Sequence, residues 1–81
     1  MRILNNDQNS AIKSAILYFT KNEAQELKIA LDELIESKNK KGVHYHIYDE
    51  CYTHEITICT YEESNLEGFN ERSLKIIKDD K

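Results

Sequence analysis

Residues 43–61 read VHYHIYDECYTHEITICTY, and they give the clearest signal of the fold in the sequence. It is rich in β-branched and aromatic residues, which strands favour. Apolar and polar residues alternate along both halves, which is typical of strands that bury one face. The stretch therefore predicts a β-hairpin that turns around residues 49–52.

The period of two also assigns each side chain to a face of the hairpin. If Val43, Tyr45 and Ile47 are to share a core with Ile56 and Ile58, an odd position must lie opposite an even one. The simplest register pairs Tyr48 with Thr53, His46 with Glu55 and His44 with Thr57. The outward face then holds His44, His46, Tyr48, Glu55, Thr57, Cys59 and Tyr61. His54 is expected on the inner face and Cys51 in the turn.

A helix is predicted before the hairpin, over residues 21–37. Thr20 and Glu23 have the spacing of a capping box, in which each side chain accepts a hydrogen bond from the other residue's backbone N–H. The expected buried stripe consists of Ala24, Leu27, Ala30, Leu31, Leu34 and Ile35. The helix should end near Ser37 or Lys38, where the lysines and glycine of residues 38–42 suit a helix C-terminus.

A second helix is predicted after the hairpin. Ser64 and Glu67 have the same S-x-x-E spacing as the first capping box. The expected apolar stripe consists of Leu66, Phe69, Ser73, Ile76 and Ile77.

The first twenty residues fit two structures. Residues 11–19 have apolar positions at both helical and strand spacing, and we favour a strand because Thr20 is a strong helix start with no glycine before it. Residues 1–4 would pair with this strand. The order is then β-β-α-β-β-α, in one α+β domain over residues 1–81. We expect a two-layer sandwich, with two helices on one face of a small antiparallel sheet.

Composition excludes several classes of function. With 15 Asp and Glu against 11 Lys and Arg, the 81-residue chain has a net charge of -4, which would repel a phosphate backbone and attract a basic protein. No apolar run approaches the ~20 residues that span a bilayer, and the N-terminus does not read as a signal peptide. The chain is therefore expected in the cytoplasm without membrane or nucleic-acid contact, with Cys51 and Cys59 as reduced thiols.

Chemistry at the hairpin has weak support. His44, His46, Glu55 and Cys59 offer zinc donors on one face, so a small metal- or ligand-binding module is an alternative. Their spacing is generic, however, and no established metal motif is present. Cys51 and His54 lie three residues apart without a third orienting group, so a nucleophilic site is not expected. The sequence thus predicts a protein that is not an enzyme and needs no cofactor.

The acidic helix and the outward sheet face together suggest a protein-binding surface. Its expected residues are His44, His46, Tyr48, Glu55, Thr57, Tyr61, Glu26 and Glu33. Tyrosine supplies rigid amphipathic contact area at interfaces, and the acidic side chains would steer a basic partner. A homodimer through an uncovered strand edge or sheet face is a further alternative.

The segments YFTKNEAQELKIALDELIE and HEITICTYEESNLEGFNER resemble those of small bacterial proteins grouped with the immunity proteins of polymorphic toxin systems. The resemblance covers residues 16–77. It implies a cytoplasmic antidote that binds a toxin or nuclease-type target and blocks it without chemistry. Small acidic phage proteins that inhibit host defence nucleases look similar in sequence. The resemblance assigns no role to an individual residue.

Overall fold

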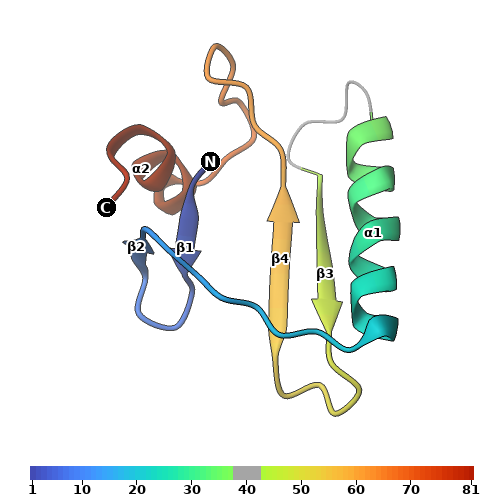
Figure 1. The fold of residues 1–81 in the computed structure, drawn as a ribbon. Coiled ribbons are helices and arrows are strands. Elements are labelled where there is room, and N and C mark those ends of the chain that lie inside the picture. The colour runs from blue at the N-terminus through green and yellow to red at the C-terminus, as the bar shows by residue number, and fades with distance from the viewer. Residues whose placement is uncertain (38–42) are drawn as a thin grey trace. The chain divides into compact units, whose positions relative to one another are not determined.

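The computed structural model describes residues 1–37 and 43–81 (Figure 1). Its elements are β1 (Ile3–Asn5), β2 (Ser10–Ile12), α1 (Lys21–Glu36), β3 (His44–Tyr48), β4 (Glu55–Cys59) and α2 (Glu71–Asp79). This order confirms the predicted α+β class and the β-β-α-β-β-α sequence of elements. Within the described ranges, no helix is both long and apolar enough to cross a membrane.

The chain divides into two compact units. One consists of Met1–Leu17 with Gly68–Lys81, and the other of Tyr18–Glu67. The described strands form two antiparallel two-stranded sheets, β1 with β2 and β3 with β4, whereas the sequence predicted one sheet. Each unit therefore contains one hairpin and one helix, so the two helices do not share the single sheet that was expected. The single-domain organisation over residues 1–81 stays a prediction.

In the first unit, the β1–β2 hairpin closes through an asparagine. Asn5 Oδ1 accepts hydrogen bonds from the backbone N–H groups of Asp7 and Gln8, both at 3.1 Å. Asn9 has a φ of 55°, in the left-handed region that asparagine tolerates better than most residues. The polar stretch before residue 10 is thus a turn, and its asparagine and aspartate residues suit one.

The predicted strand over residues 11–19 is wrong beyond Ile12. Ile3, at the start of β1, pairs with Ile12, so the residues after Ile12 have no partner in β1. The segment that follows is neither strand nor helix, and Ile16 and Leu17 are exposed. Without a partner strand this exposed run makes no ladder hydrogen bonds, so its apolar pattern does not produce a strand.

The predicted start of the second helix is also wrong. α2 begins at Glu71, and its cap is Asn70, whose Oδ1 accepts the N–H of Ser73 at 2.8 Å. Gly68 has a φ of 94°, which breaks any helix continuing from Ser64. The Arg2 Nε donates to the carbonyls of Ile76 and Ile77, each at 3.1 Å, and so ties the N-terminal segment to α2.

In the second unit, the capping box of α1 is confirmed. Thr20 Oγ1 accepts the N–H of Glu23 at 3.2 Å, and Glu23 Oε1 accepts the N–H of Thr20 at 2.9 Å. Ala30 and Leu34 are buried. Leu31 and Ile35 were expected in the same stripe but are exposed. The predicted lysine and glycine signals at the end of this helix lie outside the described residues.

The correction to the stripe has a geometric reason. A helix that packs on a narrow two-stranded sheet buries a narrow band of side chains, centred here on Ala30 and Leu34. Leu31 and Ile35 lie about 80° and about 120° from the centre of this band, because each residue turns the helix by about 100°. α1 contacts β3 rather than the full width of a sheet, so this flank stays outside the core.

The hairpin of β3 and β4 has the predicted faces but not the predicted register. Tyr48 pairs with Glu55, His46 with Thr57 and His44 with Cys59, a shift of two residues. A shift of two keeps every side chain on its face. Burial confirms the division, since Ile47 is buried and its neighbours His46 and Tyr48 are exposed. The core of this unit lies between α1 and the Ile47 side of β3.

Candidate functional site

The outward face of the β3–β4 hairpin holds most of the residues predicted to bind a partner. His44, His46 and Tyr48 lie on β3, and Glu55, Thr57 and Cys59 on β4. All six are exposed. Tyr61 was predicted on the same face, but β4 ends at Cys59, two residues before it. Tyr61 is only partly exposed.

Aromatic rings form a continuous row along this face. The His44 and His46 rings are 5.2 Å apart in an edge-to-face arrangement, and the His46 and Tyr48 rings are stacked at 6.3 Å. Tyr48 in turn lies 5.5 Å from Tyr52 in the turn. We call these four residues the ring row. Tyr52 is 77% exposed, so the row ends in solvent.

Glu55 lies beside the ring row and is held by three of its neighbours. Its Oε1 accepts a hydrogen bond from Thr57 Oγ1 at 3.2 Å and lies 3.4 Å from His46 Nδ1. Hydrogen bonding to Tyr48 lowers the pKa of Glu55, with further help from Thr57 and His46, and the same bond raises the pKa of Tyr48. The predicted contact between His46 and Glu55 is therefore confirmed, although it runs diagonally across the strands.

Asp49 stabilises the turn between β3 and β4, which is longer than the predicted register allowed. Its Oδ1 accepts the N–H groups of Thr53 at 2.8 Å and His54 at 3.2 Å, and its Oδ2 lies 2.6 Å from His54 Nδ1. These contacts use residues 53 and 54 in the turn, which is why the register shifts. Hydrogen bonds from His54 hold the pKa of the Asp49 carboxyl far below its usual range.

His54 is the one histidine whose predicted position is wrong. Its side chain is 86% exposed rather than turned into the core. Thr53 Oγ1 and Asp49 Oδ2 both contact the same ring nitrogen, Nδ1, so this group does not have the relay geometry of a catalytic triad. Cys51 lies in the turn as predicted, and both Cys51 and Cys59 are free thiols.

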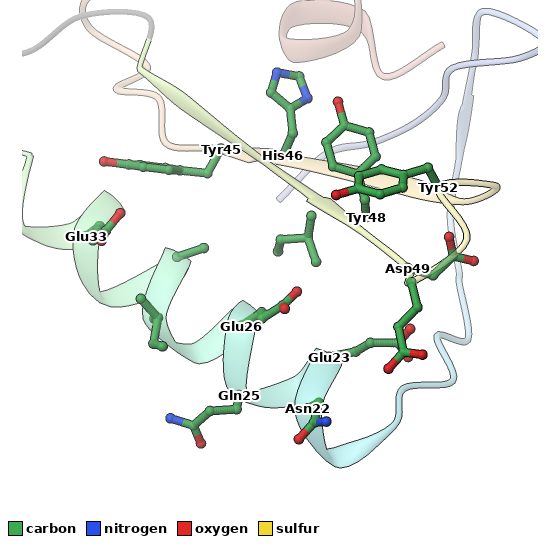
Figure 2. A pocket seen from close by; sticks show the side chains of 14 residues that line it. Asn22, Glu23, Gln25, Glu26, Glu33, Tyr45, His46, Tyr48, Asp49 and Tyr52 are labelled. Atoms are coloured by element: carbon green, nitrogen blue, oxygen red, sulfur yellow. The ribbon is translucent and has the colours of Figure 1, made fainter.

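A groove of about 780 Å³ runs between α1 and β3, as Figure 2 shows. Residues 45–50 of β3 and its turn line one side, and α1 lines the other. From α1 come Asn22, Glu23, Gln25, Glu26, Ile29, Ala30 and Glu33, and Tyr52 completes the lining. The groove thus joins Glu26 and Glu33, predicted from the acidic helix, to His46 and Tyr48, predicted from the sheet.

The lining of the groove is strongly acidic. Among its residues are Glu23, Glu26, Glu33, Asp49 and Glu50, and no lysine or arginine lines it within residues 1–37 and 43–81. The surrounding unit has the same sign. Residues 18–67 carry 11 Asp and Glu against 5 Lys, a net -6, while the remaining residues carry 4 against 6, a net +2, which together give the chain's -4. The acidity of the whole chain is therefore concentrated in the unit that holds the groove.

The sequence missed part of this site. Tyr52 is the end of the ring row, and Ile29 provides exposed apolar surface in the groove. Ile29 is not three or four residues from any member of the predicted buried stripe. An apolar residue outside that stripe was the only sequence signal for its place in the groove. Asp49 was readable as a turn residue, because aspartate often bonds backbone N–H groups a few residues ahead.

The metal alternative has no cluster to support it. Among the described residues, no group of three or more His, Cys, Asp and Glu side chains could hold a metal ion. His44 and Cys59 are opposite each other in the register, and His46 meets Glu55, but these are two separate pairs. Although Cys59 is exposed as a residue, partial burial of its thiol raises the pKa of that group, which disfavours the thiolate that a metal requires. A metal-binding role stays a prediction.

Comparison of this chain with protein families, with curated proteins and with solved structures found no match.

Proposed function

We propose that this protein is a non-enzymatic inhibitor or antidote that blocks a larger, basic protein by binding it through the α1–β3 groove and the ring row. The observation that carries the proposal is the composition of the groove. Five carboxylates line it beside exposed aromatic rings, and none of the described residues that line it is lysine or arginine. Such a surface complements lysine- and arginine-rich protein and repels nucleic acid.

The ring row strengthens the choice of partner. Arginine and lysine side chains stack on aromatic faces, and nearby carboxylates add to the attraction. Tyr48 and Tyr52 offer such faces, with Glu55 hydrogen-bonded to Tyr48. Aromatic side chains are also the ones that most often carry binding energy at interfaces.

A toxin or a nuclease is a fitting partner, because enzymes that act on nucleic acids carry basic surfaces. An acidic protein that occupies such a surface blocks the substrate without chemistry. This agrees with the immunity-type or phage anti-defence role that the resemblance implied, and a cytoplasmic location follows from that role. A homodimer through the same groove is less favoured, because two copies would bring like charges together.

The test is capture of the partner by variants matched in charge. The double variant Glu26→Lys with Glu33→Lys reverses two charges inside the groove. The control Asp32→Lys with Glu63→Lys makes the same change in net charge at exposed positions outside it. We expect the wild type and the control to capture a basic protein from a lysate of the source cell and to inhibit its activity, and the groove variant to lose both.

Capture that survives the groove variant would contradict the proposed surface. A second pair of variants separates the ring row from the groove. Tyr48→Ala with Tyr61→Ala should weaken binding mainly through Tyr48, because Tyr61 lies beyond β4 and is partly buried. If the single change Tyr61→Ala weakens binding as much as Tyr48→Ala, the ring row is not the contact surface.

A further inference from the structure

The α1–β3 groove opens along the edge of β3 rather than on one of its faces. Successive side chains of a strand point to opposite faces. Tyr45, His46, Ile47 and Tyr48 are consecutive, and all four line the groove. Figure 2 shows Tyr45 on the side of α1 and the rings of His46 and Tyr48 on the other side of β3. Side chains from both faces of β3 can line one groove only where the two faces meet, which is at the edge of the strand.

The backbone at this edge is oriented to pair with another strand. Asp49 N–H donates to the His54 carbonyl at 3.2 Å, which makes this facing pair a hydrogen-bonded one. Such pairs alternate along an antiparallel ladder. The next facing pair, Tyr48 with Glu55, is therefore a non-hydrogen-bonded pair, and so is His46 with Thr57. The N–H and C=O groups of Tyr48 and His46 consequently point away from β4.

Among the described strands, β3 has only β4 as a neighbour. A strand edge with outward N–H and C=O groups is a template for another extended chain. Many domains bind peptides by adding a strand at such an edge, where backbone hydrogen bonds give affinity and side-chain pockets give specificity.

The groove supplies the specificity. Glu26, Ile29 and Glu33 follow one another along the α1 side. Glu26 and Glu33 are seven residues apart, which corresponds to about 10 Å along a helix. In an added strand, side chains on one face recur about every 7 Å, so the first and third of them span about 13 Å. Flexible lysine or arginine side chains at these two positions can reach both carboxylates, with an apolar side chain between them against Ile29.

We propose that the open edge of β3 binds an extended segment of a basic protein as an added strand. Alternate side chains of this segment face α1 in the order cationic, apolar, cationic, and the others lie beside the ring row. The inference rests on the proposed function and specifies its binding mode. Charge favours a basic protein over a second copy of this chain, because the carboxylates of the groove would repel another copy of this acidic unit.

The test uses a synthetic peptide whose alternate positions read lysine, valine, lysine, with threonine between them, so that one face carries the proposed order. Both ends of the peptide are blocked. Its binding is measured by titration and by the amide NMR signals of the full chain. We expect the largest shifts at the amides of His46 and Tyr48. The same peptide with N-methyl groups on the residues that pair with β3 cannot donate those hydrogen bonds, and should bind at least about tenfold more weakly.

A matched pair of variants tests the edge from the other side. His46→Pro and His46→Ala both remove the imidazole, but only proline also removes the outward N–H, and proline is tolerated at a strand edge. We expect His46→Pro to weaken peptide binding severalfold beyond His46→Ala. The dispersion of the other amide signals reports whether each variant is folded, and the N-methylated peptide tests the edge without any change to the protein.

The outcomes separate the two proposals. If the N-methylated and unmethylated peptides bind equally, while Glu26→Lys with Glu33→Lys still abolishes binding, strand addition is overturned and the acidic groove stands. If a peptide with glutamate in place of lysine binds as well as the lysine peptide, the charge argument fails, and the proposed function falls with it.

Discussion

Leu34 and Leu31 provide a direct test of where the core of the second unit lies. They are the same residue type, on the same helix, and their spacing predicts that both are buried. Leu34 is 5% exposed and Leu31 is 42% exposed. Truncation of each to alanine removes the same three carbon atoms, so any difference in stability reports their surroundings and not their chemistry.

The magnitudes follow from burial. Each buried carbon contributes about 0.8 kcal/mol, so Leu34→Ala should lose about 2.3 kcal/mol of transfer energy and about 3 kcal/mol with a partly collapsed cavity. Leu31→Ala should lose about 1.4 kcal/mol, without an enclosed cavity. A domain of this length has a total stability of about 4–12 kcal/mol, so the first change removes a quarter or more of it.

The assay is urea denaturation followed by far-UV circular dichroism, with thermal melts in parallel. The slope of the free energy against urea should stay unchanged, so that the midpoints compare stability directly. Leu34→Ala should lower the melting temperature by at least about 12 °C, because 1 kcal/mol corresponds to about 4–8 °C in a chain of this size. Ile35→Ala is a third point, at about 0.7 kcal/mol, since this side chain is 72% exposed.

Equal losses for Leu31→Ala and Leu34→Ala would contradict this location of the core. They would mean that the flank of α1 holding Leu31 is covered in solution as fully as the stripe holding Leu34. A loss below about 1 kcal/mol for Leu34→Ala would be equally damaging, because a buried leucine cannot be truncated at that cost.

Two further predictions concern the helix cap and the turn. Asn70→Ala should destabilise the protein by about 1 kcal/mol, because Asn70 caps α2. Ser64→Ala should have no measurable effect on stability. Denaturation of both variants decides between the observed and the predicted start of the helix. The pKa of Asp49 is lower in the folded protein than its usual 3.8, so its contribution is present above about pH 4 and is lost as the pH falls below that value. Asp49→Asn keeps an oxygen for the two turn N–H groups but removes the charge. The free energy of unfolding, measured from pH 7 to about pH 2, should therefore fall less steeply in this variant than in the wild type. An equal dependence of the free energy on pH in both proteins would contradict the role of the carboxylate.

Two local signals gave correct predictions. The capping box of Thr20 and Glu23 set the start of α1 because both partners lie within one helical turn. The alternation in residues 43–61 assigned the faces of β3 and β4, including the exposed positions of His46 and Tyr48, because a period of two is a property of the extended chain itself. The same rules failed at Ser64, where Gly68 turns the backbone before a helix can form.

The α+β class, the order of elements, the faces of the hairpin and the acidity behind the proposed basic partner could all be predicted from the sequence. The register of the hairpin and the groove could not. The register depended on how many residues the Asp49 carboxylate draws into the turn, which only the folded loop reveals. The groove depended on which side of α1 packs against β3, because that contact joins Glu26 and Glu33 to the ring row and leaves the edge of β3 facing outward. The contacts between α1 and β3 join residues far apart in the chain, and the periodicity of each segment gives no information about them.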